Sequence, residues 1–478
     1  MEQNKYDIIV IGCGSGGLSV GLFMAMAGFK TLMVSKSDQS IGGDCLNDGC
    51  VPSKALIHVA KIAQQAKEAT NFGLTISGTI DIKKAIRYVF EKQELIRGHE
   101  NAAWLSNQGI DVALGEAHFT GRNEIEVAGT RYGAKKIVIA TGSSPRKLQI
   151  QGIELVRYYD NENIFHLDEL PAQLLLVGAG PIGIEIAQTL SRLGSKVTIV
   201  HKGERILEHD DQLITDILLT KLKQEGIEIY LNAEVTHFAS STEAIINEKD
   251  NGTKRIQFDA VFAAIGRQLM LDDLQLEKAG VSVAEGKIVA DKYLKTTNKN
   301  IFVCGDIAGD LQFSHAAEFH ARILLNNFFS PFKKKLKNDH MSWVTFTDPE
   351  VATFGLSEKQ LKERNIRFEK LVQEFTDDDR AVTDNYQYSS ALLCITKKRF
   401  LKKQRILGGS MIAPNAGELI QELILANTAG LSINSIFNKI YPYPVAARIN
   451  QQAIVQYKSK ALNSTIKALL KPLYKIFS

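Results

Sequence analysis

The chain has 478 residues, of which 45% are hydrophobic and 23% are charged, as in an ordinary globular protein. That length exceeds what one hydrophobic core supports and predicts roughly three or four domains. The formal net charge of +4 is small for this length, which argues against wholesale binding of nucleic acid.

The cysteines and the N-terminus bear on the cellular compartment. The five cysteines are irregularly spaced, which argues against a secreted disulfide scaffold and favours a reducing compartment. Residues 1–6 are polar and show no signal-peptide pattern, and no uncharged apolar run reaches the roughly eighteen residues that a membrane span needs. We therefore expect a cytoplasmic protein.

An internal repeat is the most informative feature: residues 8–36 align without a gap on residues 174–202. Each copy has an apolar segment, a glycine-rich turn, a helical pattern and a second apolar segment, which predicts a βαβ unit in a parallel sheet. In such a turn the glycines allow a tight bend, a close approach to a pyrophosphate and helix–strand packing, and the helix N-terminus attracts the phosphates. Two turns in register predict two dinucleotide sites. Their glycines are Gly12, Gly14, Gly17, Gly178, Gly180 and Gly183.

Two further apolar segments end in turn residues. The first ends in Thr141 and Gly142, and the second ends in Gly305 and Asp306 before a helical pattern. A strand that delivers a carboxylate beside a helix start could hold the ribityl chain of a flavin. A helix-capping role for Asp306 is the alternative.

The segment GGDCLNDGCVPSK places Cys45 and Cys50 immediately before a predicted helix over residues 55–69. Five helical residues rise about 7.5 Å, whereas the Cα atoms of a disulfide lie about 4.4–6.8 Å apart, so a bridge needs a distorted turn, which Gly49 permits. Strained, exchange-labile disulfides are the catalytic kind. Two reduced cysteines or half a metal site are the alternatives, but no second cysteine pair completes a zinc site, and we predict no metal site.

This segment, the two glycine turns and the later TDPEVATFGLSE resemble, in order, the pyridine nucleotide–disulfide oxidoreductases, which include dihydrolipoamide dehydrogenase, glutathione reductase and mercuric ion reductase. The resemblance implies an α/β fold with two Rossmann-like domains that bind FAD and NAD(P), and a C-terminal α+β dimerisation domain that makes a homodimer. The implied divisions are an FAD domain over 1–150, an NAD(P) domain over 151–270, a central domain over 271–340, the dimerisation domain over 341–460 and a basic tail over 461–478.

The resemblance also implies roles for individual residues. Cys50 would be the thiolate facing the flavin, and Cys45 the thiol that attacks the acceptor. Lys54 would lie beside the flavin N5 and pair with Glu185, where its charge would favour a neighbouring thiolate. Asp306 would hold the ribityl region. Further cofactor-binding positions are Lys36, Gly43, Asp44, Gly266, Arg267 and His315.

Two positions that usually carry an acidic residue for the ribose hydroxyls lack one. By the gapless repeat they are Ser35 and His201. Ser35 can still bind the ribose of FAD as a neutral partner. At the second site, the missing acid beside Lys202 and Arg205 favours the 2′-phosphate of NADPH over NADH, with solvated loop charges as the alternative.

The C-terminal acid–base motif of the family is also changed. Disulfide reductases of the family have His-Pro-Thr with a glutamate five residues after the histidine, contributed across the dimer. Here Tyr443 and Arg448 occupy those two positions. A tyrosine with a pKa near 10 donates a proton but is a poor base near neutrality. Tyr443 is similar to the residue of mercuric ion reductase, but the tail lacks the cysteine pair with which that enzyme delivers its metal.

We therefore predict an FAD-dependent NAD(P)H:disulfide oxidoreductase that works without the usual His-Glu pair on a small-molecule or protein acceptor. The alternative is an NAD(P)H-dependent reductase of a quinone, a metal ion or another non-disulfide acceptor. A non-catalytic flavoprotein subunit is less favoured, because a scaffold has no need of the cysteine pair. The basic tail is predicted to pack on its own dimer, with contact to an anionic membrane surface as the less favoured alternative.

Overall fold

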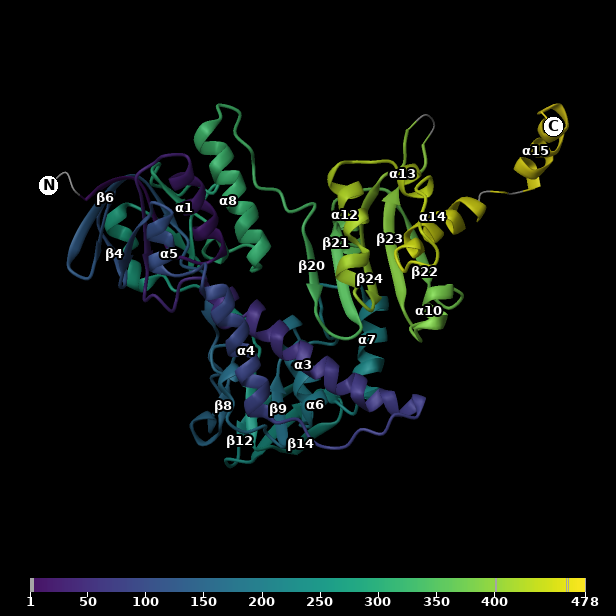
Figure 1. The fold of residues 1–478 in the computed structure, drawn as a ribbon, viewed down its shortest axis with the longest axis horizontal. Helices are drawn as coiled ribbons and strands as arrows, with labels where there is room; N and C mark the ends of the chain where they lie inside the picture. The colour runs from purple at the N-terminus through teal and green to yellow at the C-terminus, as the bar shows by residue number, and fades with distance from the viewer. Residues whose placement is uncertain (1–3, 400–401, 461, 463, 478) are drawn as a thin grey trace. The chain divides into compact units, whose positions relative to one another are not determined.

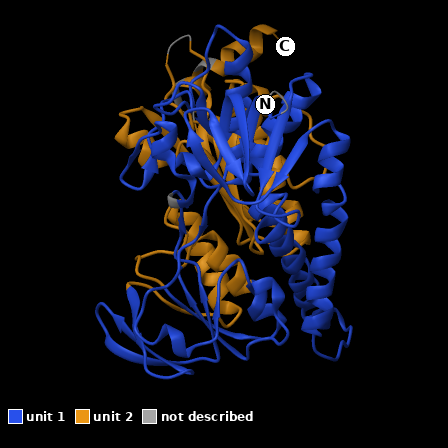
Figure 2. Cartoon of the chain, turned by 90° about the vertical axis from the view of Figure 1, so that its left-hand side faces the viewer, with its two compact units in different colours: residues 1–178, 189–200, 233–336 blue, residues 179–188, 201–232, 337–478 orange. Residues whose placement is uncertain are grey.

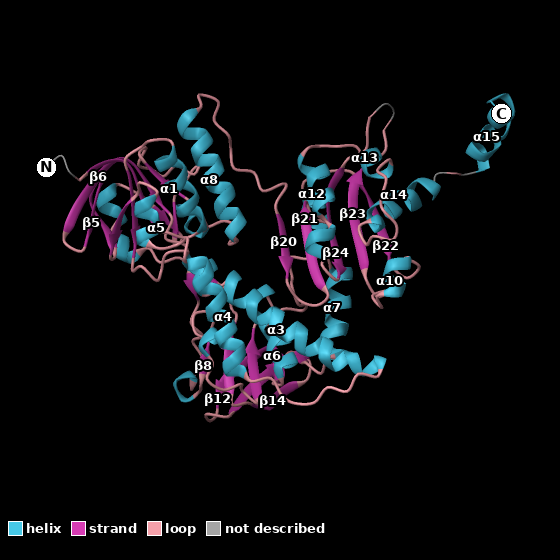
Figure 3. Ribbon diagram, viewed as in Figure 1, coloured by secondary structure: helices cyan, strands magenta, loops and turns pink. Residues whose placement is uncertain are grey.

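A computed structural model describes residues 4–399, 402–460, 462 and 464–477 (Figure 1). The chain divides into two compact units, coloured separately in Figure 2. Unit 1 comprises residues 1–178, 189–200 and 233–336, and unit 2 comprises residues 179–188, 201–232 and 337–478. Each unit contains both helices and strands (Figure 3).

Within the described part of unit 1, the largest sheet has seven strands in the order β3-β2-β1-β6-β5-β4, with β19 also paired to β6. The pairings among β1, β2, β3, β6 and β19 are parallel, whereas β4, β5 and the start of β6 form an antiparallel meander. The bounds are β1 Lys5–Ile11, β2 Thr31–Ser35, β3 Asp111–Leu114, β4 Ala117–Gly121, β5 Glu124–Val127, β6 Thr130–Ile139 and β19 Ile301–Val303.

The apolar side chains of the central strands of this sheet are buried together with side chains of helices. Successive residues of a strand face opposite sides, so a strand that is apolar throughout needs cover on both. Ile8, Ile9 and Val10 of β1 are fully buried, in one core with side chains of α1 (Ser15–Met26) and α8 (Ser314–Phe329). The other described helices of this region are α2 Gly43–Asn47, α3 Cys50–Glu68, α4 Ile82–Arg97 and α5 Ala102–Asn107.

A second parallel sheet of unit 1 contains β10, β9, β15 and β8 in that order. The predicted repeat is confirmed: β1, α1 and β2 match β9, α6 (Pro181–Leu193) and β10 in element type and position. The bounds are β8 Tyr158–Tyr159, β9 Gln173–Val177, β10 Lys196–Val200 and β15 Ala260–Ala263. Smaller antiparallel groups are β12 Ala233–Phe238, β13 Glu243–Glu248 and β14 Gly252–Gln257; β7 Ser144–Pro145 and β16 Arg267–Gln268; and β17 Val283–Ala284 and β18 Lys287–Ile288.

The start of the helix after the cysteines differs from the prediction. The sequence predicted a helix over residues 55–69, whereas α3 begins at Cys50. Pro52 lies in the first turn of α3, where a missing backbone N–H costs no intrahelical hydrogen bond, so it does not delay the helix. Cys45 lies in the short helix α2.

Unit 2 contains the predicted C-terminal α+β module. Its five-stranded antiparallel sheet has the order β20-β21-β24-β23-β22 (Figure 3). The strands are β20 Ser342–Thr345, β21 Glu350–Gly355, β22 Phe368–Glu374, β23 Ser390–Thr396 and β24 Ile406–Ala413. Other described elements are β11 Glu228–Tyr230, α7 Gln212–Gln224, α9 Glu358–Glu363, α10 Asp379–Thr383, α11 Ala416–Leu419, α12 Gln421–Thr428, α13 Ile433–Phe437, α14 Arg448–Lys460 and α15 Ser464–Phe477. None of the helices in the described ranges has the length and apolar character needed to cross a bilayer.

Candidate active site

The two cysteines of the motif lie at the junction of α2 and α3. Cys50 is the first residue of α3, so its thiol lies at the positive end of a helix of 19 residues. Cys45 lies in α2 and is half-buried, and both thiols are reduced. The Sγ atom of Cys50 lies 3.6 Å from the hydroxyl oxygen of Ser314, the first residue of α8. The sequence did not indicate Ser314.

The two thiols differ in acidity. The pKa of Cys50 is lowered to about 6, mainly because it accepts a hydrogen bond from Cys45 and further because of the Lys54 charge and the Ser314 hydroxyl. The pKa of Cys45 is raised, first by that same hydrogen bond and then by burial. At neutral pH the reduced pair therefore holds a thiolate at Cys50 and a neutral thiol at Cys45.

The other three cysteines are of a different kind. Cys13, Cys304 and Cys394 are buried, and burial raises the pKa of each to about 12. A thiol with that pKa stays protonated at neutral pH, and the protonated form is a poor nucleophile. These three cysteines are therefore core residues.

Lys54 and Glu185 were predicted to act together. Lys54 lies one turn after Cys50 in α3, where its charge stabilises the Cys50 thiolate. Glu185 lies in α6 and is buried, and its Oε1 atom accepts a hydrogen bond of 2.7 Å from the backbone N–H of Phe346. The pairing of Lys54 with Glu185 stays a prediction.

Two acidic side chains lie close to the cysteines. Asp44 accepts a hydrogen bond of 3.1 Å from Asn161. Asp48 lies between α2 and α3, and burial, together with the charges of Asp44 and Glu162, raises its pKa to about 7. Asp48 therefore titrates near neutrality beside the redox pair, and no sequence pattern indicated this.

At the first glycine turn, backbone segments approach one another closely without side chains between them. A Cβ atom added at Gly43 would lie 2.7 Å from the Cα of Gly14, so only glycine lets these two segments approach. Gly12 has a φ of +108°, and a side chain there would meet the backbone of Ala140. A Cβ at Gly17 would overlap the carbonyl oxygen of Gly12, so α1 packs directly on β1.

A partly buried polar network joins four residues that are distant in the sequence. Arg267, whose side chain is only 11% exposed, donates to Asp44 at 2.9 Å and to the Ser143 hydroxyl and carbonyl oxygens at 2.7 Å each. The Ser143 hydroxyl donates to Oδ2 of Asp306 at 2.6 Å. Burial raises the pKa of Asp306, while Ser143 and Arg267 oppose that shift. The sequence indicated Asp44, Arg267 and Asp306 but missed Ser143.

Three predicted glycines adopt the left-handed backbone that other residues avoid. Gly142, Gly266 and Gly305 have φ values of +73°, +99° and +80°. A side chain added at Gly142 or Gly266 would meet no atom within 4 Å, so both face open space. The exposed Thr141 precedes Gly142 directly after β6.

Two histidines, His315 and His320, lie in α8, and the sequence indicated only the exposed His315 as a cofactor-binding position. His315 stacks on Phe313 with the ring centres 5.2 Å apart. His320 is buried, and its Nδ1 accepts a hydrogen bond of 3.2 Å from the backbone N–H of Gly305. Burial lowers the pKa of His320, so a neutral ring holds this turn in place.

The predicted ribose end of the first site is engaged in local contacts. Ser35 is buried, and its hydroxyl lies 2.9 Å from that of Ser40. Lys36 is exposed and forms an ion pair of 3.3 Å with Glu116. A ribose hydroxyl would therefore share Ser35 with Ser40.

These residues fit an FAD molecule. Gly14 and Gly43 bring two backbone segments together without side chains, and no side chain caps the start of α1 at Gly14, which leaves its first backbone N–H groups for phosphate oxygens. Asp306 supplies a partly buried carboxylate at the turn after β19, a strand of the same sheet. When bound, FAD supplies the chemistry of taking a hydride from a nicotinamide and passing the electron pair to a disulfide.

The second turn repeats the first in backbone shape. Gly178 has a φ of +108°, and a side chain there would meet the backbone of Ala264, whereas Gly180 faces open space. Gly183 lies within α6.

Beyond this turn, the His201 ring is engaged in contacts within the chain. Its Nδ1 accepts a hydrogen bond of 3.3 Å from the backbone N–H of Ala179, and its Nε2 lies 3.6 Å from Glu208. Arg205 donates to the carbonyl oxygen of Glu208 at 3.0 Å, and Lys202 is exposed. The sequence missed Glu208, whose charge partly offsets the basic residues.

Tyr443 lies in unit 2 just before α14 and is 68% exposed. Its hydroxyl donates a hydrogen bond of 2.9 Å to Asp379, and the guanidinium of Arg448 lies 5.6 Å from its ring centre. The hydrogen bond and charge of Asp379 raise the pKa of Tyr443, and Arg448 only partly opposes them. Tyr443 therefore stays protonated at neutral pH and is a weaker acid than free tyrosine.

Comparison with known protein families agrees with this geometry. A family model described as pyridine nucleotide-disulphide oxidoreductase matches residues 6–321, and the dimerisation domain of the same family matches residues 341–454. The chain belongs to this family. It is therefore an FAD-dependent oxidoreductase whose electron donor is NAD(P)H, as the family predicted from the sequence implies.

Named relatives fall into more than one activity. The chain is 30% identical to a mercuric reductase of Bacillus cereus, over 95% of this chain and 71% of that protein. It is 32% identical to a dihydrolipoyl dehydrogenase of Mycoplasma pneumoniae, over 92% of this chain and 96% of that protein. Among solved structures it resembles the HOCl-induced flavoprotein disulfide reductase RclA from Escherichia coli, with a TM-score of 0.81 and 29% identity over 93% of this chain and 98% of that one. A Cu(II) complex of a cysteine-to-serine mutant of RclA gives a TM-score of 0.84 and 27% identity, over 95% and 99% of the chains.

No group of three or more His, Cys, Asp or Glu side chains among the described residues is arranged to hold an ion.

Proposed function

We propose that this chain is a homodimeric NAD(P)H-dependent disulfide reductase in which Cys45 and Cys50 form the redox-active pair. One observation carries the proposal: Cys50 has a pKa lowered to about 6, whereas the three buried cysteines have pKa values raised to about 12. A strongly perturbed thiol beside a second thiol, at a helix start, is typical of redox work. The sparse and irregular spacing of the five cysteines in the sequence supports a cytoplasmic location.

The two thiols would divide the work. The disulfide takes up two electrons and becomes the dithiol, with Cys50 retained as the thiolate next to Lys54. Cys45 attacks one sulfur of the acceptor disulfide, which breaks the acceptor S–S bond, releases one thiolate and forms a mixed disulfide, while the Cys45 proton can pass to Cys50 along the hydrogen bond that joins them. Cys50, once deprotonated, then attacks the Cys45 sulfur, which releases the second thiolate and restores the Cys45–Cys50 disulfide. Ser314 stabilises negative charge on either sulfur.

Protonation of the reduced acceptor would come from Tyr443 of the partner subunit. The supporting observation is the hydrogen bond to Asp379, which raises the pKa of Tyr443, so the hydroxyl carries a proton at neutral pH but gives it up less readily than free tyrosine. Without the His-Glu pair of the family, the chain has no group at those two positions that titrates near neutrality. Loss of such help typically slows a reaction by ~10²–10⁴. We therefore expect slow turnover of ordinary disulfide substrates.

NADPH is proposed as the preferred donor. The His201 ring is occupied by Ala179 and Glu208, so recognition of a 2′-phosphate would rest on Lys202 and Arg205. Because Glu208 lies in the same loop, the preference over NADH should be modest, on the order of tenfold.

The test is an anaerobic titration of the purified flavoprotein with NADPH and, separately, with NADH. We expect a long-wavelength absorbance band from the Cys50 thiolate beside oxidised flavin after two electrons, and faster reduction by NADPH. Cys50→Ser should remove the band, and the matched variant Cys394→Ser, in the core of unit 2, should keep it. Flavin bleaching without the band in the unaltered chain would overturn the proposal.

A second candidate function is reduction of a non-disulfide acceptor, a metal ion or a quinone. It is favoured by the state of Tyr443 and by the likeness to a mercuric reductase and to a protein solved as a Cu(II) complex. The double variant Cys45→Ser, Cys50→Ser separates the cases. Quinone turnover that survives it would support direct reduction, whereas Cu(II) reduction that disappears with it would assign the thiols to the metal.

A further inference from the structure

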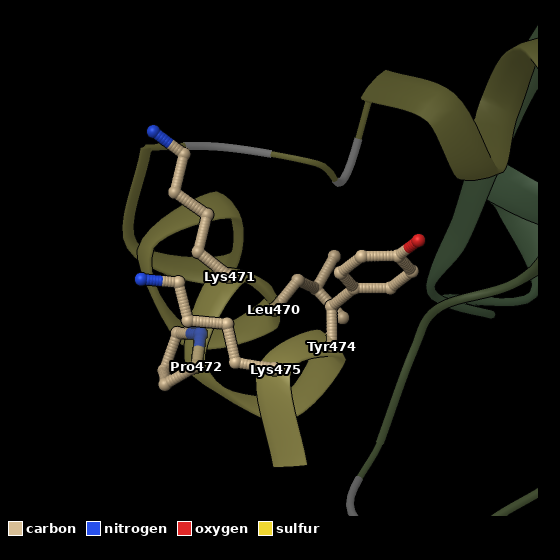
Figure 4. A pocket seen from close by; sticks show the side chains of 5 residues that line it. All are labelled: Leu470, Lys471, Pro472, Tyr474 and Lys475. Atoms are coloured by element: carbon tan, nitrogen blue, oxygen red, sulfur yellow. The ribbon is translucent and has the colours of Figure 1, made fainter. Parts of the chain in front are cut away.

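The C-terminal helix α15 (Ser464–Phe477) has two chemically different sides. At 100° per residue, Ile466, Leu470, Leu473, Tyr474 and Phe477 fall on one side. Lys467, Lys471 and Lys475 recur every four residues and form a row along another side. Figure 4 shows Leu470 and Tyr474 pointing to one side of the helix, and Lys471 and Lys475 pointing to the other.

The apolar side of α15 is exposed. Exposed fractions range from 36% for Ile466 to 85% for Phe477, with Leu470, Leu473 and Tyr474 between them. The hollow shown in Figure 4 is lined by residues of α15 itself (Leu470, Lys471, Pro472, Tyr474 and Lys475), so it is part of this surface and not a ligand pocket. An exposed apolar strip of this kind marks a surface that a membrane or another protein covers.

The charge around this strip has one sign. No acidic residue follows Glu422 in the whole sequence, and Lys458 and Lys460 at the end of α14 precede the three lysines of α15. An anionic surface complements such a segment, because each lysine near it adds attraction. A second copy of α15 would instead bring a second lysine row beside the first, which like-charge repulsion disfavours.

We propose that α15 lies in the surface of an anionic phospholipid bilayer, with its apolar side toward the acyl chains and its lysine row toward the headgroup phosphates. An apolar side with leucine and phenylalanine and a lysine-rich polar side are the properties of helices that lie in this interface. Pro472 lacks a backbone N–H and weakens a helix of this length in water, so lipid should increase its helicity. The enzyme would then reach acceptors at or in the membrane.

The experiment uses the full-length holoenzyme and flotation with two kinds of vesicle, phosphatidylcholine alone and phosphatidylcholine mixed with phosphatidylglycerol. We expect binding to the mixed vesicles only, and weakening at high salt. The variant Lys467→Glu, Lys471→Glu, Lys475→Glu should bind about a hundredfold more weakly, or worse. A matched control, Lys249→Glu, Lys278→Glu, Lys359→Glu, makes the same change in net charge at exposed lysines elsewhere and should bind normally.

A second variant tests the apolar side without changing charge. Leu470→Ser, Leu473→Ser should lose vesicle binding even at low salt, while flavin absorbance and NAD(P)H oxidation stay unchanged. Normal flavin properties in each variant separate a failure here from a failure of the proposed reductase activity.

Three results would overturn the proposal. The first is that the unaltered enzyme does not bind the mixed vesicles. The second is that the control variant at Lys249, Lys278 and Lys359 loses as much vesicle binding as the α15 variant. The third is that the α15 variants change their oligomeric state in the absence of lipid. The last result would assign α15 to a contact between copies of the chain.

Discussion

In two regions of the chain, the pKa of an ionisable side chain is shifted in opposite directions. At the start of α3, Cys45 and Lys54 lower the pKa of Cys50 to about 6, so this group ionises below neutrality. Before α14, Asp379 raises the pKa of Tyr443, so this group stays protonated well above neutrality. In both cases one neighbour in hydrogen-bond contact makes the largest contribution.

The difference separates two halves of the family's chemistry. Under the proposed function, the cysteine region supplies what electron transfer to a disulfide needs: a thiolate, a neutral thiol and a cation. The tyrosine region, under the same proposal, supplies no group that exchanges protons near neutral pH. Electron transfer within the chain and proton transfer to the acceptor should then respond separately to substitution.

The largest effect should come from removing the thiolate. Cys50→Ser leaves no partner for Cys45 and no disulfide, so turnover of a disulfide acceptor should fall by ~10³-fold or more. Steady-state assay with lipoamide or glutathione disulfide measures this loss. Cys394→Ser is the control, and substantial turnover by Cys50→Ser would remove the cysteine region from the reaction.

The next largest effect, an increase in turnover rate, should come from introducing the family's His-Glu pair. The change Tyr443→His, Arg448→Glu supplies a group that titrates near 6.5 beside a carboxylate, so kcat/KM for a disulfide acceptor should rise by about 10²-fold. The pH profile should gain a new limb near that value. Tyr443→Phe, Arg448→Glu serves as the control without a titrating group. An unchanged rate in the histidine variant would show that proton transfer does not limit turnover.

The pH dependence of the thiolate band should reveal a smaller effect. A thiolate forms as pH rises through the pKa, so the band of the reduced enzyme should be half developed near pH 6 and grow above it. Lys54→Met removes a positive charge that favours the thiolate, so the midpoint should move upward by about one unit. Lys61→Met, further along α3, should leave it in place. A downward move in Lys54→Met would contradict the assigned electrostatics.

The smallest effect is expected at Ser314. Ser314→Ala removes a hydroxyl 3.6 Å from the Cys50 sulfur, a long contact, so the midpoint should rise by about half a unit. Ser314→Thr keeps the hydroxyl and should restore the original midpoint. If both variants shift it equally, packing and not the hydroxyl is responsible.

The sequence predicted the parts of the fold that repeat and missed those that depend on distant contacts. The βαβ units around Gly12 and Gly178 follow from local apolar periodicity and turn chemistry, which need no tertiary information. The antiparallel strands β12, β13 and β14 between β10 and β15 were not anticipated, because their short alternating pattern is weak without its partners.

The site shows the same division. The cysteine motif is local and was found, whereas Ser314 reaches Cys50 across 264 positions and Arg267 reaches Asp44 across 223. His201 was placed correctly at a strand end, but its ring turns toward Ala179 and Glu208. The direction of a side chain depends on which neighbours the folded chain supplies, and no sequence pattern records that.

The three core cysteines have a practical consequence. With pKa values near 12, Cys13, Cys304 and Cys394 stay unreactive toward alkylating reagents in mildly acidic solution, and Cys45 is held as a thiol by its neighbour. Iodoacetamide at that pH should label one position, Cys50, and only in molecules whose pair is reduced. The labelled fraction would then report, in mildly acidic solution, the fraction of enzyme molecules whose pair is reduced, without an engineered tag.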